Sequence, residues 1–79
     1  MRILDGDYTR ILDSVYIYLT PSEAREMADG LRMLIGKPSE RHFHVNDDSF
    51  EREVIVSIYT QDNFDGFDER SKRLISEGR

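Results

Sequence analysis

Cysteine and tryptophan are both absent from this chain of 79 residues. Without cysteine there can be no disulfide, no thiolate metal ligand and no cysteine nucleophile. Small secreted domains often depend on disulfides, so the absence of cysteine favours a cytoplasmic location. Hydrophobic residues make up only 38% of the chain. Because so short a chain buries only about 60% of its unfolded surface, we expect one domain, residues 1–79, with a thin core.

Long apolar runs are also missing. No stretch approaches the roughly 20 apolar residues that a membrane-spanning helix needs. The first residues, Met-Arg-Ile-Leu-Asp-Gly, contain no apolar core of signal-peptide length. The sequence therefore predicts a protein without a membrane segment.

Positive charge is in deficit, because the formal net charge is −5. A surface of this sign repels phosphate backbones, which argues against direct nucleic-acid binding as the main role. It suits a protein partner with a basic surface, although acidic surfaces also serve solubility alone.

Catalytic signatures are equally scarce. The serines are scattered and none lies in a Gly-x-Ser-x-Gly turn. The chain has no glycine-rich phosphate loop, and no internal repeat is evident in it. These observations favour a protein that binds rather than catalyses.

The clearest structural signal present is a helix start. Thr20 can cap the first turn and Glu23 can reach back to it, as in a capping box. The apolar residues of segment 21–35 then follow helical spacing, and residues 36–38, Gly-Lys-Pro, supply a stop. Gly30 inside this helix costs roughly 1 kcal/mol relative to alanine. A close approach to the sheet would explain the glycine.

Several segments alternate in the period-two manner of strands. They are residues 2–4, 8–12, 15–19, 41–45 and 53–60, and a weaker helix is expected over residues 67–77 with Asp65 as its cap. We therefore predict an α+β fold: an antiparallel sheet of about four strands, one main helix packed across one face, and a short C-terminal helix. Two β-rich segments each precede a helix, which suggests a ββα order used twice as topology, without sequence duplication.

Tyrosines provide the first candidate binding surface. Tyr16 and Tyr18 alternate with the apolar residues of segment 15–19. If the main helix covers the apolar side, these two tyrosines lie on the open face of the sheet, where Tyr59 could extend the patch. Tyrosine is enriched at protein interfaces because it buries area and keeps a polar tip. The alternative is simple exposure, since strands favour tyrosine in any case.

An acidic cluster provides the second candidate binding surface. Asp47, Asp48, Glu51 and Glu53 surround the predicted tip of the 41–60 hairpin, interrupted by Arg52. Such a cluster could enter a basic cleft and imitate phosphates. The alternative is ordinary turn chemistry with solvated glutamates.

His42 and His44 are two residues apart on a predicted strand and so project from the same face. Together with Asp47 or Asp48 they could form a two-histidine, one-carboxylate metal site for zinc or manganese. The alternative is a solvent-facing pair whose neighbours pack into the core.

In size, acidity and α+β plan, the chain resembles small bacterial immunity proteins, antitoxins and phage-encoded inhibitors. Together with the negative charge and the lack of catalytic motifs, this general resemblance favours a non-catalytic module that binds a basic partner surface as an inhibitor, immunity or antitoxin-type protein. The predicted contact residues are Tyr16, Tyr18, Asp47, Asp48, Glu51 and Tyr59. Two alternatives are a metal-binding protein or small metal-dependent enzyme that uses His42, His44 and Asp47, and a homo-oligomeric structural protein such as a homodimer.

Overall fold

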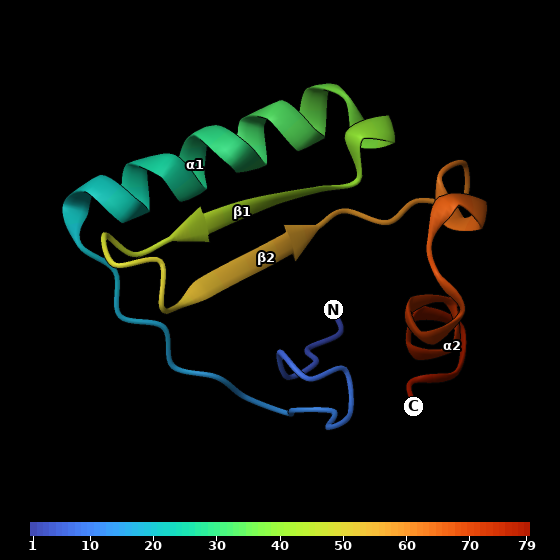
Figure 1. Cartoon of the computed structure of the whole chain (residues 1–79). Helices are drawn as coiled ribbons and strands as arrows, with labels where there is room; N and C mark the ends of the chain where they lie inside the picture. The colour runs from blue at the N-terminus through green and yellow to red at the C-terminus, as the bar shows by residue number, and fades with distance from the viewer. The chain divides into compact units, whose positions relative to one another are not determined.

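The computed structural model describes all 79 residues, which form two compact units. One unit is Tyr18–Asn63, and the other combines Met1–Ile17 with Phe64–Arg79. The elements in chain order are α1 (Pro21–Gly36), the 3-10 turn η1 (Pro38–Glu40), β1 (His42–Asn46), β2 (Glu53–Ser57), the 3-10 turn η2 (Phe64–Gly66) and α2 (Glu69–Glu77) (Figure 1). The predicted α+β class is confirmed, and neither helix is long and apolar enough to cross a membrane. A single domain and a cytoplasmic location stay predictions.

Helix α1 begins and ends where its sequence signals predict. The Thr20 hydroxyl accepts a hydrogen bond from the Glu23 amide at 3.2 Å, and the Glu23 carboxylate accepts one from the Thr20 amide at 2.9 Å. This is a complete capping box, which satisfies two amides that the first turn leaves unpaired. At the other end the amide of Lys37 donates to Met33, and the proline that follows starts η1.

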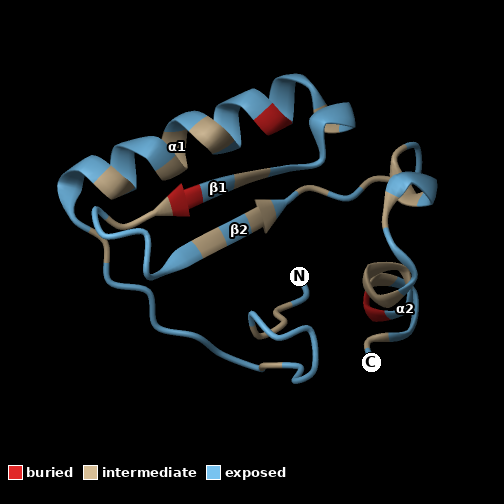
Figure 2. Ribbon diagram, viewed as in Figure 1, coloured by how far each residue is buried: buried red, intermediate tan, exposed pale blue.

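Strands β1 and β2 form an antiparallel hairpin with His42 paired to Ser57 and Asn46 paired to Glu53. Helix α1 runs along this hairpin in the same unit (Figure 1). The buried residues of this unit are Leu34 of α1 and Val45 of β1 (Figure 2). The predicted face pattern of β1 is confirmed, because its two histidines are exposed.

The prediction of about four strands is wrong in number, because the sheet has two. Segments 2–4 and 8–12 meet only at one isolated bridge, between Leu4 and Ile11. Segment 15–19 belongs to neither strand. Alternation of apolar residues indicates that a segment can be a strand, but a strand also needs a neighbour in register to complete its ladder. Here the chain supplies that neighbour only for β1 and β2.

Helix α2 lies in the other unit and starts later than predicted. Its cap is Asp68, whose carboxylate accepts a hydrogen bond from the Ser71 amide at 2.8 Å, and Asp65 instead lies in η2. Asp68 caps the helix in place of Asp65 because its backbone is extended, which leaves its side chain facing the first turn. The helix buries Leu74, and the carbonyl of that residue accepts a hydrogen bond from the side chain of Arg2 at 2.9 Å.

Candidate functional site

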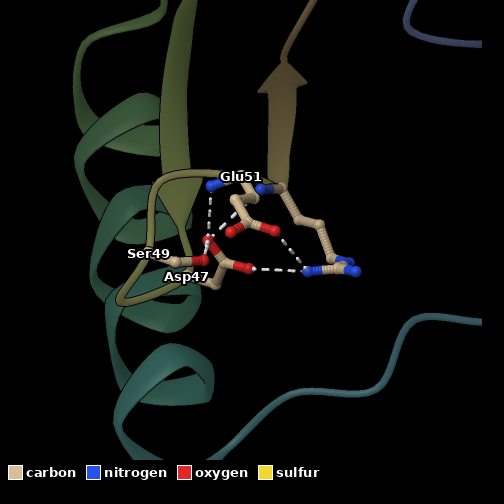
Figure 3. Close-up of polar contacts among 4 residues, drawn as sticks. Asp47, Ser49 and Glu51 are labelled. Carbon is tan, nitrogen blue, oxygen red and sulfur yellow. Dashed lines mark hydrogen bonds and ion pairs between the residues drawn. The ribbon is translucent and has the colours of Figure 1, made fainter.

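The loop between β1 and β2 spans residues 47–52. It is called the second tip, because a similar loop, described below, comes earlier in the chain. One oxygen of the Asp47 carboxylate, Oδ1, accepts hydrogen bonds from the amides of Glu51 at 2.9 Å and Arg52 at 3.2 Å. It also accepts one from the Ser49 hydroxyl at 3.2 Å (Figure 3). The Asp47 amide donates to the carbonyl of Arg52 at 3.1 Å, which closes the loop. Asp47 therefore holds the shape of the tip.

Hydrogen bonds also set the charge of the tip. The hydrogen bond from the Arg52 amide is the largest effect and lowers the pKa of Asp47 below its ordinary value. Desolvation opposes it, and weaker hydrogen bonds from the Glu51 amide and the Ser49 hydroxyl lower the pKa further. The Arg52 guanidinium lies 3.5 Å from Asp47 Oδ2 and 3.6 Å from a carboxylate oxygen of Glu51 (Figure 3). Asp48 is exposed and forms no ion pair. Of the predicted contact residues, Asp48 thus presents an unpaired charge to solvent and Glu51 an exposed charge that pairs with Arg52, while Asp47 holds the loop.

Phe50 is the residue of the second tip that the sequence analysis missed. Its side chain is 78% exposed, and its backbone is left-handed with φ of 57°. That conformation is rare for a bulky residue and costs roughly 1–2 kcal/mol. Strained positions of this kind cluster at functional sites. The available signal was an aromatic residue inside a turn segment between Asp47 and Arg52, where polar residues are usual.

The structure does not place the predicted tyrosines on a sheet face. Tyr16 and Tyr18 are 86% and 88% exposed, but they lie in segment 15–19, which is not a strand. Tyr59 comes two residues after the end of β2. The open-face tyrosine patch is therefore corrected to three separate exposed positions, because the third strand on which it depended does not form.

The two histidines lie side by side on β1, with ring centroids 5.2 Å apart in an edge-to-face arrangement. His44 Nδ1 is 3.2 Å from a carboxylate oxygen of Glu53 on the neighbouring strand. The structure forms no group of three or more histidine, aspartate or glutamate residues that could hold a metal ion. It therefore does not bring Asp47 or Asp48 together with the histidine pair.

The second tip has a counterpart at residues 5–10, here called the first tip. In the first tip the Asp5 amide donates to Arg10 at 3.0 Å and the Tyr8 amide donates to Asp5 at 3.1 Å. Asp5 Oδ1 accepts from the Thr9 and Arg10 amides at 2.9 and 3.2 Å. The four corresponding bonds of the second tip agree within 0.1 Å: 3.1, 3.0, 2.9 and 3.2 Å.

The two tips share a short turn pattern, Asp-x-x-aromatic-x-Arg, which the sequence analysis did not recognise. In both copies the aromatic residue is left-handed, with φ of 65° at Tyr8 and 57° at Phe50. Only three of the six positions keep their chemical type, so the similarity is faint in the sequence and plain in the hydrogen bonds. The shared pattern covers the turns only, since the first tip is closed by one bridge and the second by a full hairpin.

Comparison of the chain with protein-family models, with curated proteins and with solved structures finds no match. The evidence for its function is therefore the sites described above.

Proposed function

We propose that this protein is a small, non-catalytic module that binds a basic surface of another protein through the second tip. The observation that carries the proposal is Phe50, a large apolar side chain held exposed at a loop tip in a strained backbone conformation. Aromatic residues at the centre of an interface supply much of its binding energy. An inhibitor, immunity or antitoxin role fits this mode of binding, because blocking a basic site requires a shaped negative surface rather than chemistry.

Charge supports the same assignment. Asp48, two residues before Phe50, and Glu51, directly after it, are both exposed. Carboxylates at the rim of an interface mainly accelerate association with a basic partner. The network around Asp47 orders the loop before binding, which reduces the entropy that association must overcome. The second tip thus combines an apolar anchor, steering charge and a preformed shape.

The test begins with affinity capture of a partner from the native host, followed by association kinetics on the purified pair. Reversing the two exposed charges, with Asp48→Lys and Glu51→Lys together, should slow association and flatten its salt dependence, because steering is electrostatic. Phe50→Asn should instead accelerate dissociation, since asparagine tolerates the left-handed backbone and removes only the ring.

A matched control reverses the same number of exposed charges away from the tip, with Asp13→Lys and Asp62→Lys. These two carboxylates are exposed and form no ion pair. If both double variants associate equally fast, net charge alone explains the effect and the second tip is not the binding site. Unchanged kinetics in the tip variants would contradict the proposal directly.

Self-association is a second candidate, favoured by the thin core. Only Leu34, Val45 and Leu74 are buried, whereas Ile35 and Ile55 are 70% and 52% exposed. A homodimer could cover such side chains and add buried area that the monomer lacks. Sedimentation equilibrium from micromolar to millimolar concentration tests this, and a monomer throughout would remove it.

A further inference from the structure

The first tip shows what a turn of this kind binds inside the unit it belongs to. The carbonyl of Tyr8 accepts a hydrogen bond from Nε of Arg70 at 3.2 Å. The Tyr8 hydroxyl donates to the carboxylate of Asp68 at 3.3 Å. Asp68 is the cap of α2 and Arg70 is in its first turn. The first tip is therefore docked on the start of a helix, with its left-handed aromatic residue at the contact.

The second tip has the same backbone and no such partner. The only hydrogen bond of Phe50 is the one that its amide donates to Asp47, at 3.0 Å, so its carbonyl accepts none. Its side chain is 78% exposed, against 51% for the docked Tyr8. Tyr8 makes its contacts through its carbonyl and its hydroxyl; the corresponding carbonyl of Phe50 is available, and its ring is exposed.

The differences between the two tips favour an arginine at the second. The first tip has Gly6 and Thr9 where the second has Asp48 and Glu51. In the docked copy, Nη1 of Arg70 is buried without a hydrogen-bond partner. A carboxylate at either position would offer such a nitrogen a charge-assisted hydrogen bond, which is stronger than a neutral one. The second tip therefore adds acceptors of the kind that the docked copy lacks.

We infer that the partner of the second tip is the first turn of an α-helix that carries an arginine, whose guanidinium donates to the carbonyl of Phe50 and pairs with Asp48 or Glu51. This inference depends on the proposed function and specifies its partner chemically. Phenylalanine lacks the hydroxyl of Tyr8, so contact with the helix cap is replaced by apolar contact of the ring. The basic surface expected of the partner is then a single arginine presented by a helix.

The probe for this inference is a peptide with the sequence of residues 67–79 of this chain. A lactam between Lys72 and the glutamate of Ser76→Glu keeps it helical on the side away from Arg70. The peptide is titrated into the ¹⁵N-labelled full chain, and amide shifts are followed for residues 48–52 and, separately, for residues 5–10. A second peptide with Arg70→Met keeps the aliphatic stem and removes the donors.

We expect the arginine peptide to shift the amides of residues 48–52. The methionine peptide should bind at least about tenfold more weakly, because a hydrogen bond to a charged group contributes about 1.5–3 kcal/mol. The double variant Asp48→Asn and Glu51→Asn should weaken the arginine peptide and leave the methionine peptide unchanged. At position 48 asparagine keeps the size of the aspartate side chain, and at both positions it removes the negative charge.

Other outcomes separate this inference from the proposed function. Equal binding of both peptides at residues 48–52 would overturn the arginine requirement and leave the second tip as a binding site. Shifts confined to residues 5–10, or no shifts, would also overturn the inference. In that case the proposed function stands if charge reversal at Asp48 and Glu51 still slows association with the captured native partner, and falls if it does not.

Discussion

The aromatic ring of Phe43 lies directly against the backbone of Gly30. A Cβ atom built at Gly30 would be 2.5 Å from Cδ2 and 2.7 Å from Cγ of that ring. No side chain fits at this distance, so the glycine lets α1 approach β1 closely enough for Phe43 to pack under the helix. The close approach expected from a glycine inside a helix is thereby confirmed.

Gly30→Ala should destabilise the protein although alanine is the better helix former. Helix propensity favours alanine by about 1 kcal/mol. Forcing a methyl group into a packed contact costs typically 1–3 kcal/mol, and the nearest ring atoms include Cγ, which moves away only if the whole Phe43 ring leaves its χ1 rotamer or the strand shifts. We expect a net loss of about 1 kcal/mol in the free energy of unfolding, measured by urea titration.

Gly36→Ala is the matched control, because Gly36 ends the same helix and a methyl group there would have nothing within 4 Å. Propensity should then act alone and stabilise the protein by up to about 1 kcal/mol. If Gly30→Ala is stabilising as well, the contact with Phe43 does not constrain the helix.

Asn63 is a second position at which a single side chain organises the fold. Its Nδ2 donates to the carbonyls of Pro38 at 3.0 Å and Ile58 at 2.9 Å, and its Oδ1 accepts from the Thr60 amide at 2.7 Å. Asn63→Ala should lower the free energy of unfolding by about 1–3 kcal/mol, because partly buried backbone groups lose their partners. Thermal and urea unfolding measure this loss. Asn46→Ala, at a comparably half-buried asparagine without side-chain hydrogen bonds, should change stability by less; an equal effect would contradict the role of Asn63.

Local signals in the sequence predicted the local structure well. The capping box at Thr20, the stop after Gly36 and the two-residue period of β1 all act over a few residues, and each is confirmed. The number of strands could not be predicted in this way. Segment 15–19 has the composition of a strand, but whether a strand forms depends on a partner elsewhere in the chain, which alternation does not reveal.

The candidate site was predicted in part. The acidic residues around the 47–52 turn were recognised, but their separate roles were not. Composition cannot show that Oδ1 of Asp47 accepts three hydrogen bonds while Asp48 forms no ion pair. Phe50 was missed because its importance lies in its backbone angle and exposure, which three-dimensional structure alone supplies. The match between the two tips likewise lies in their hydrogen bonds.

Phe50→Gly should leave stability nearly unchanged. Glycine relieves the left-handed strain of roughly 1–2 kcal/mol and adds roughly 0.5–1 kcal/mol of backbone entropy cost, and the exposed ring contributes little burial. Tyr8→Gly relieves the same strain but also loses a ring that is less exposed than that of Phe50, 51% against 78%, and the hydrogen bond to Asp68. We expect the Tyr8 variant to be less stable than the Phe50 variant by about 1–2 kcal/mol in urea unfolding. Equal stabilities would mean that the Tyr8 side chain adds no more stability than the Phe50 side chain, so that its hydrogen bond to Asp68 does not help to dock the first tip.

Acid should unfold the protein through the aspartates that hold the two tips and cap α2. Donation from the Arg52 amide lowers the pKa of Asp47, the Thr9 amide lowers that of Asp5, and the Ser71 amide lowers that of Asp68. Because each folded-state pKa is depressed, the stabilisation is present above the unfolded value of about 3.9. It is lost as the pH falls below that value and through the folded-state pKa.

Asp47→Asn isolates the contribution of the second tip, because asparagine keeps an acceptor oxygen and cannot titrate. At pH 7 the variant should be less stable than the wild type, since the amides of Glu51 and Arg52 lose a charged acceptor. The difference should shrink as the wild-type carboxylate is protonated, and it should be smallest near pH 2.5. Urea unfolding of both proteins between pH 2.5 and 7 measures it. A stability difference that stays constant across this range would show that the Asp47 charge does not stabilise the turn.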